Sequence, residues 1–250
     1  MKRRRSQSIY YHTMVLPGMI FILIFGYIPM FGLVMAFQDF VPAKGFLKSE
    51  FVGIKHFKYM ITLPDIGRVI GNTLIIAAGK IVLGMLLSIS FAILLNEIWN
   101  KYLKKTVQTI VYLPHFLSWV VLASVVVNLF NVDGSINQIL NSLGVERINF
   151  LGSNDVFRKL IIGTDVWKEF GYNSVVYLAA ITGIDAGLHE AAAIDGAGRW
   201  KQAVHITMPC LKPTILIMFV LSFASVLNLF EPLYVLSNPL VQESAMVLDT

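Results

Sequence analysis

Residues 14–37 read MVLPGMIFILIFGYIPMFGLVMAF, a run of 24 positions without a charged side chain between His12 and Asp39. A helix needs about 20 mostly apolar residues to cross the hydrocarbon core of a bilayer. Thirteen of the 24 are Leu, Ile, Val or Phe. Each contributes about −0.3 to −0.6 kcal/mol to insertion, or roughly −4 to −8 kcal/mol together. The run therefore predicts a membrane-spanning helix.

The basic residues before this run, Lys2 to Arg5, also suit the start of a secretory signal peptide. A signal peptide has an apolar stretch of about 7–15 residues followed by small residues at a cleavage site. The run here is too long for that class. Its prolines and glycines are tolerated in a membrane helix that packs among others. We therefore expect an uncleaved first span.

The composition of the whole chain points the same way. Of its 250 residues, 56% are hydrophobic and 14% are charged, whereas soluble domains carry about 25% charged residues. These values exclude an ordinary soluble enzyme and a disordered chain. A single cysteine, Cys210, excludes a disulfide framework and a thiolate metal site. The net charge of +5 does not indicate nucleic-acid binding, because the basic residues lie between apolar runs.

Four further runs are candidates for spans, which makes five in all. They cover residues 69–96, 106–132, about 160–184, and 213–230 with an extension toward 236. The predicted fold is an all-α polytopic helical membrane protein. The run at 160–184 is the weakest, because Asp165, Lys168 and Glu169 lie in it. Asp165 and Lys168 share a helix face and are expected to pair, either as a structural ion pair or as a substrate contact.

The tetrabasic start places the amino terminus in the cytoplasm by the positive-inside rule. Alternation then puts residues 97–105 and about 185–212 on the cytoplasmic side and leaves the carboxyl terminus outside. The last residues, 244–250, read as a loop cut in mid-course, so we expect a sixth span to be missing. The predicted organisation is a basic tail at 1–12 and one transmembrane domain at 13–250.

The loop at 185–212 has unusual composition for a connection between spans. Residues 191–193 are three alanines, which favour helix and permit close approach of another body. Gly196 and Gly198 allow a sharp change of direction, and a second short helix is expected over 199–206. Pro209 is expected to end that helix, and Pro213 to occupy the first turn of the next span. The loop is therefore a bent helical segment that docks into a partner, or a plain amphipathic connector.

The same loop resembles the EAA motif of binding-protein-dependent ABC importer permeases. The motif has E-A-A, then D-G-A, then I-x-L-P, and Met208 stands where leucine is more common. The matching residues are Glu190, Ala191, Ala192, Asp195, Gly196, Ala197, Ile206 and Pro209. A looser resemblance to the sugar-permease branch, related to the maltose and glycerol-phosphate importers, covers most of the chain, from the basic amino terminus through residues 112–114 to the region of Trp167. Residues 230–239, FEPLYVLSNP, are similar to permeases for complex polysaccharides.

This resemblance implies a type I ABC importer transmembrane domain in a bacterial inner membrane. It implies a second, homologous permease, two cytosolic ATPase subunits, and an extracytoplasmic solute-binding protein that delivers a carbohydrate. The eight matching residues would couple the chain to the ATPase. ATP and Mg²⁺ would bind the ATPase, and this chain would carry no cofactor and would not be an enzyme.

Polar and aromatic residues in or near the spans are candidates for a substrate pathway. Amide and carboxylate groups can satisfy sugar hydroxyls, and aromatic rings can stack on sugar faces. The alternative is that these groups bond neighbouring helices. The candidates are Asn128, Tyr172, Asn173, Asn228, Phe230, Glu231 and Tyr234.

The sequence lacks residues that a nucleotide-binding site and a zinc site would need. A phosphate-binding P-loop would need glycine at Leu74 and a hydroxyl at Ile81. A zincin motif around His189 would need histidine at Ala193. An ATP-independent secondary transporter is the alternative function, although it predicts internal repeats that the halves do not show. A membrane-embedded enzyme ranks last.

Overall fold

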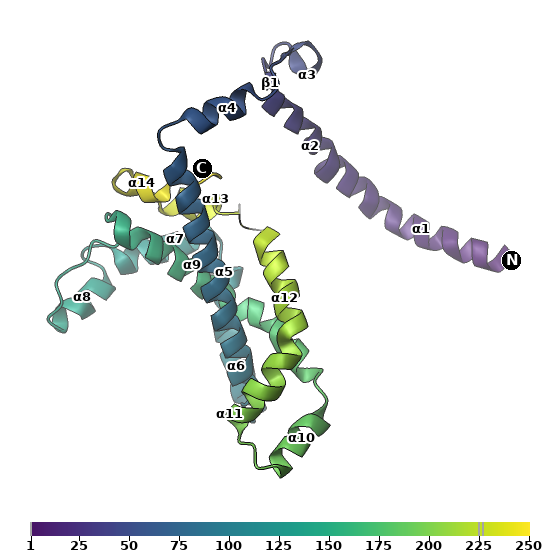
Figure 1. The fold of residues 1–250 in the computed structure, drawn as a ribbon, viewed down its shortest axis with the longest axis vertical. Coiled ribbons are helices and arrows are strands. Elements are labelled where there is room, and N and C mark those ends of the chain that lie inside the picture. Colours follow the sequence, from purple (N-terminus) through teal and green to yellow (C-terminus); the bar gives the residue numbers. More distant parts are fainter. Residues whose placement is uncertain (1, 225, 227) are drawn as a thin grey trace. The chain divides into compact units, whose positions relative to one another are not determined.

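The computed structural model describes residues 2–224, 226 and 228–250, with side chains from residue 10 onward. Its ribbon is almost entirely helical (Figure 1). The chain divides into two compact units, Met1–Ile66 and Gly67–Thr250.

The first unit contains the first expected span. Its helical elements are α1 (Lys2–Ile22), a π-helical turn (Leu23–Tyr27), α2 (Ile28–Met30) and a 3₁₀ helix (Phe31–Phe37). Tyr10–Phe37 is long and apolar enough to cross a membrane, and its side chains are exposed. This outcome confirms the prediction from residues 14–37.

A small hairpin follows the span. Strands β1 (Gln38–Asp39) and β2 (Glu50–Phe51) pair antiparallel, with Gln38 opposite Phe51. Helix α3 (Gly45–Lys48) lies between the strands and α4 (Lys55–Thr62) follows them. The Lys55 ammonium lies 2.7 Å from the Asp39 carboxylate. This hydrogen bond lowers the pKa of Asp39 and raises the pKa of Lys55.

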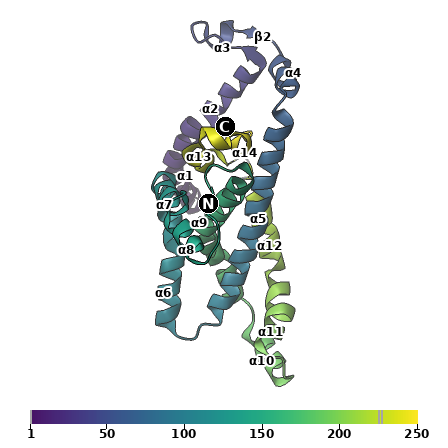
Figure 2. The same cartoon turned by 90° about the vertical axis from the view of Figure 1, so that its left-hand side faces the viewer.

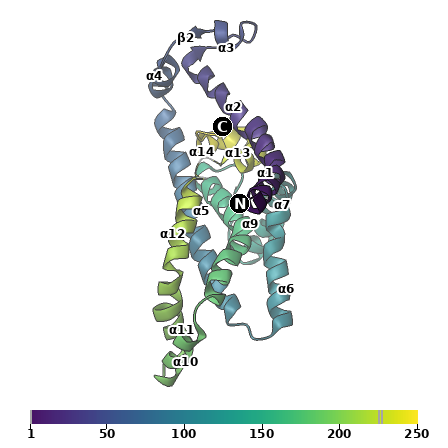
Figure 3. The ribbon, with the colours of Figure 1, turned by 90° about the vertical axis from the view of Figure 1, so that its right-hand side faces the viewer.

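The second unit holds the remaining helices. They are α5 (Ile66–Asn96), which begins at the boundary, α6 (Lys101–Tyr112), α7 (Trp119–Phe130), α8 (Ser135–Ser142), α9 (Asn154–Thr182), α10 (Ala186–Ile194), α11 (Arg199–Gln202), α12 (Met208–Ala224), α13 (Phe230–Leu236) and α14 (Gln242–Ala245). Within this unit, α10 and α11 lie at one end, while α13 and α14 lie toward the other (Figures 1 and 2). Helices α5 and α12 run side by side, as the view from the opposite side also shows (Figure 3).

Four segments are long and apolar enough to cross a membrane among the residues that the structure describes. They are Tyr10–Phe37, Ile66–Asn96, Trp119–Ser142 and Arg199–Ala224. The remaining candidate, residues 160–184, lies in α9, which has 29 residues. Its charged residues keep α9 out of this group. Helix α9 is nevertheless central, because it packs against α6, α12, α13 and α14.

The third expected span, residues 106–132, is wrong as one continuous helix. Helix α6 ends at Tyr112, and a 3₁₀ helix with Pro114 covers Leu113–Phe116. Ser118 then has an extended backbone, and its hydroxyl caps α7 by accepting the Val121 N–H. Proline favours a helix start over a helix interior, which explains the break before α7.

The expected boundaries around the fifth span are also wrong. Pro209 does not end a helix, Pro213 lies inside α12 and not in its first turn, and α12 ends at Ala224 well before residue 230. A π turn at Ala203–Thr207, closed by the Met208 N–H on the Ala203 carbonyl, directly precedes α12. Wide turns of this kind accommodate the hydrogen bond that a proline cannot donate. The π turn at Leu23–Tyr27 likewise ends two residues before a proline, Pro29.

Two apolar clusters form the core of the second unit. One joins α5, α7, the start of α9 and residues 229–247, with Ile76, Leu122 and Phe157 fully buried. The other joins α5, α9 and α12 through Ala92, Tyr177 and Leu211. Helices α5 and α9 therefore contribute to both clusters. In each helix, the segment between the two clusters has apolar contacts on either side of it.

The carboxyl-terminal residues are packed against the unit. The expected loop over 244–250 begins after Ala245, because Ser244 and Ala245 belong to α14 and residues 246–250 are non-helical. Ser244 and Val247 are buried. The Asn72 amide donates to the carbonyls of Glu243 and Met246, at 2.8 and 2.9 Å. The Leu248 N–H donates to the Thr73 hydroxyl at 3.0 Å.

A glycine permits the contact between α6 and α9. A Cβ atom at Gly171 would overlap the Val111 carbonyl, whereas a Cβ at Gly163, on the same helix, would meet nothing within 4 Å. We expect Gly171→Ala to destabilise the protein by about 1–3 kcal/mol through overpacking. Gly163→Ala is expected to be neutral or stabilising. Thermal unfolding in detergent checks this, and equal unfolding midpoints for the two variants would contradict it.

Candidate functional site

The loop at 185–212 folds as two short helices around a tight turn. Asp185 caps α10, because its carboxylate accepts the Gly187 N–H at 2.9 Å. At the other end the Ala197 N–H donates to the Ala192 carbonyl at 2.8 Å, and the Gly196 N–H to the Ala193 carbonyl at 3.1 Å. This pattern is a Schellman motif, which requires a left-handed residue after the helix. Gly196 supplies it with φ +76°.

A glutamine ties the two helices together. The Gln202 side chain on α11 donates to the Ala197 carbonyl at 2.8 Å and contacts the His189 ring on α10 at 3.1 Å. The expected bend at Gly196 and the expected second helix are therefore present. We call residues 185–202 the coupling knuckle.

Arg199 fastens the knuckle to the end of α5. Its guanidinium lies 3.1 Å from the Glu97 carboxylate and 5.3 Å from the centre of the Trp99 ring. A cavity of about 270 Å³ lies among these groups, His189 and Gln202. The knuckle and the end of α5 are therefore in direct contact.

Most of the eight predicted coupling residues are exposed, and all of them except Ile206 and Pro209 lie in the knuckle. Of the eight, Glu190, Ala191, Asp195, Gly196 and Pro209 are exposed, whereas Ala192, Ala197 and Ile206 are half-buried. Two large apolar side chains stand beside them: Ile194 is 87% exposed and Trp200 is 79% exposed. Exposed apolar groups next to a carboxylate suit a protein–protein contact. The sequence interpretation assigned no contact role to Ile194.

A polar cavity of about 490 Å³ lies between the two apolar clusters. Helices α5, α9 and α12 line it, together with Trp119, Val226, Asn228 and Leu229. Its polar lining side chains are Lys80, Ser88, Asp165, Glu169, Asn173, Ser222 and Asn228. Asp165, Glu169 and Asn173 are spaced by four, which places them on one face of α9.

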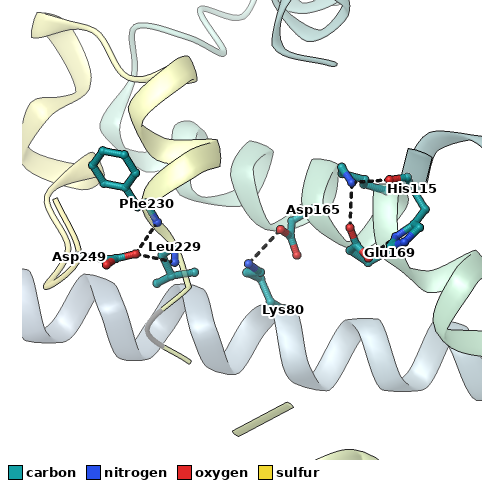
Figure 4. Close-up of polar contacts among 8 residues, drawn as sticks. Lys80, His115, Asp165, Glu169, Leu229, Phe230 and Asp249 are labelled. Carbon is teal, nitrogen blue, oxygen red and sulfur yellow. Dashed lines mark hydrogen bonds and ion pairs between the residues drawn. The ribbon is translucent and has the colours of Figure 1, made fainter. Parts of the chain in front are cut away.

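Charged groups in this region are joined in two sets (Figure 4). The Lys80 ammonium on α5 lies 2.9 Å from the Asp165 carboxylate on α9. Glu169 contacts Lys168 at 3.0 Å through one oxygen and the His115 ring at 2.8 Å through the other. Lys168 also donates to the His115 carbonyl at 2.8 Å. Each buried charge thus has a partner of opposite sign or a polar one.

The expected pairing of Asp165 with Lys168 is wrong. Residues three apart on a helix face each other, but Lys80 from α5 lies closer to Asp165. Lys168 instead donates hydrogen bonds to the Glu169 carboxylate and to the His115 carbonyl, which lies at the break between α6 and α7. Only the packing of α5 against α9 could bring Lys80 to this position.

The structure brings two of the seven predicted pathway residues into the cavity, Asn173 and Asn228. Tyr172 stacks on the His115 ring, with ring centres 3.9 Å apart. Phe230 stacks on Tyr234 at 5.0 Å, away from the cavity lining. Asn128 on α7 and Glu231 on α13 are exposed and do not line the cavity. All seven remain candidate residues.

The sequence interpretation did not select Lys80, Trp119 or Glu169 as pathway residues, although all three line the cavity. A usable signal was present for two of them. Lys80 is the sole charge within residues 69–96, and Glu169 lies four residues from both Asp165 and Asn173. No sequence pattern indicates Trp119. Among the described residues, no three His, Cys, Asp or Glu side chains form a possible metal site.

Comparison with known proteins identifies the family. The sequence profile of the family described as "Binding-protein-dependent transport system inner membrane component" matches residues 84–241, which include the knuckle and the cavity-lining residues from Gly84 onward. The chain belongs to this family. It is thus a multi-pass membrane protein with the fold of an ABC importer transmembrane domain.

Individual permeases are similar over nearly the whole chain. It is 44% identical over 246 residues to the "Polygalacturonan/rhamnogalacturonan transport system permease protein YteP" of Bacillus subtilis, covering 98% of this chain and 77% of that protein. It is 39% identical over 241 residues to "Protein LplB" of the same organism, covering 96% and 76%. A solved bacterial ABC transporter "involved in the import of the acidic polysaccharide alginate" aligns with TM-score 0.87 and 37% identity, covering 99% of this chain and 84% of that one.

The Schellman turn gives a local prediction for the permease. Serine at Gly196 must adopt a left-handed backbone at a cost of about 1–2 kcal/mol. Gly198 has φ −65° in an N-cap position, which serine favours. We expect Gly196→Ser to raise hydrogen exchange at the Gly196-turn amides, residues 195–197, about fivefold or more. Gly198→Ser is the matched control, and equal exchange in both variants would contradict the role of Gly196.

Proposed function

We propose that this chain is a permease subunit of an ATP-binding cassette importer that moves an oligosaccharide across the membrane by alternating access. The observation that carries the proposal is the coupling knuckle. It is a two-helix projection whose exposed face combines Glu190 with Ile194, and Arg199 contacts Glu97 just beyond the end of α5. Such a projection suits a cleft in a partner protein.

The proposed partner at the knuckle is a cytosolic ATPase subunit, present in two copies with a second permease. ATP and Mg²⁺ bind the ATPase, and the permease itself carries no cofactor and performs no hydrolysis. Closure of the ATPase dimer displaces the knuckle, and Arg199 passes that displacement to α5. A partner shifts the equilibrium between two states only if it binds them differently, so the docking surface must move with the spans.

The orientation follows from the same proposal. An ATPase in the cytoplasm requires residues 185–212 on the cytoplasmic side of a bacterial inner membrane. The basic amino terminus then lies on that side as well, in agreement with the positive-inside rule.

The proposed substrate class rests on the similar proteins and on the cavity. Several relatives are named for carbohydrates, including the "Trehalose/maltose transport system permease protein MalF" of Thermococcus litoralis. A solved alginate transporter was captured with a "pentasaccharide-bound periplasmic protein", which supports delivery by an extracytoplasmic binding protein. The cavity lining offers the Asn173 and Asn228 amides to sugar hydroxyls and includes the Trp119 ring. Lipid surrounds the exposed faces of the spans.

Co-purification tests the ATPase coupling. We expect an affinity-tagged chain, solubilised in mild detergent, to recover an ATPase and a second permease. Glu190→Ala and Gly196→Val should each reduce recovered ATPase about tenfold or more, because they remove a contact and deform the knuckle. The second permease should be retained. Glu146→Ala, at an exposed acidic position outside the knuckle, is the control.

Uptake distinguishes the proposal from an ATP-independent secondary transporter. In vesicles that hold the assembled complex, oligosaccharide uptake should require internal ATP and should cease in the Gly196→Val variant. Uptake that persists without ATP, or that follows an ion gradient, would identify a secondary transporter. Unchanged uptake in Gly196→Val would remove the coupling role of the knuckle.

A further inference from the structure

Two lysines reach the region of the polar cavity, and one of them is fully engaged. Lys168 donates to the His115 carbonyl and to Glu169, and its ammonium lies 5.8 Å from the centre of the Trp119 ring. Its side chain is 8% exposed. It therefore has little capacity to bind a molecule in the cavity.

Lys80 is placed differently. It lines the cavity, its side chain is 18% exposed, and an ammonium has three N–H donors. Among the residues that the structure describes, the Lys80 ammonium has one polar partner, the Asp165 carboxylate at 2.9 Å. Donors therefore remain on the Lys80 ammonium for a molecule that enters the cavity.

Glu169, the other carboxylate of the lining, does not pair with the Lys80 ammonium. Each oxygen of Glu169 already has a partner, Lys168 for one and His115 for the other. The two carboxylates of the cluster, Asp165 and Glu169, thus face two ammonium groups and an imidazole. The negative charges of this cluster therefore do not outnumber its positive charges, so they do not repel an anion that enters the cavity. The cation that can bind such an anion is Lys80.

We propose that Lys80 is the specificity-determining residue of the cavity and binds a carboxylate of an acidic oligosaccharide. This inference rests on the proposed function and names its substrate class. Asp165 keeps the ammonium in position and competes with the substrate for it. That competition limits the affinity, which an importer needs because a substrate must leave the site as well as enter it.

The test compares two substrates of nearly the same shape. We would use an oligogalacturonate and its methyl ester, which removes the charge and keeps the hydroxyls. Uptake of each is measured in vesicles that contain the assembled transporter with saturating binding protein. The same binding protein serves every variant, so its own preference cancels when the acid-to-ester ratios of the variants are compared.

The main variant is Lys80→Gln with Asp165→Asn. It replaces the ion pair by a neutral hydrogen-bonding pair and so leaves no unpaired buried charge. Hydrogen bonds to charged groups are stronger than neutral ones, and we expect the acid-to-ester ratio to fall about tenfold. Lys80→Arg should keep the ratio, because it keeps the cation. Lys159→Gln, at an exposed lysine on α9 outside this cavity, should keep it as well.

A measurement on the wild-type transporter does not depend on the variants folding. An amine-reactive reagent should label Lys80, and peptide mass spectrometry should show protection by the acid and not by the ester.

An unchanged ratio in the double variant, or equal protection by acid and ester, would overturn the role of Lys80 while leaving the proposed function intact. Wild-type vesicles that import neither oligosaccharide would overturn this inference, whereas loss of the ATPase and the second permease from the purified chain would overturn the proposed function.

Discussion

Hydrocarbon offers no hydrogen-bond partner to a peptide group, and this constraint governs the structure. Every N–H and C=O in a lipid-exposed span must find its partner within the chain. Helix satisfies this condition locally, so long apolar runs become helices with few exceptions. Departures from regular helix are informative, because each occurs at a residue that cannot make the usual hydrogen bond of an α-helix.

Proline is the main such residue here. Before Pro29 and before Pro209 the helix widens into a π turn and then continues. At Pro114 the helix instead breaks, and a 3₁₀ turn separates α6 from α7. This break presents the His115 carbonyl to Lys168. An irregular backbone segment thus serves to satisfy a charge that would otherwise be costly inside the unit.

Helix α5 connects the two parts of the candidate site. Lys80 lies in its middle and contacts Asp165 across the cavity, while Glu97 lies just beyond its end and contacts Arg199 of the knuckle. At 1.5 Å per residue the helix spans about 24 Å between these contacts. The same helix therefore contributes a side chain to the cavity and contacts the knuckle beyond its end.

Sequence by itself determined the class of fold, the first span and the bend at Gly196, because these depend on local properties. A run such as residues 14–37 must be helical in lipid whatever surrounds it, and a left-handed turn after three alanines requires glycine. Tertiary structure decided which charged side chains pair and which polar side chains line the cavity. Lys80 pairs with Asp165 although Lys168 is nearer in sequence, and Asn228 enters the cavity while Asn128 does not. Those outcomes depend on which helix faces which, and helix packing is set by contacts between residues far apart in the chain.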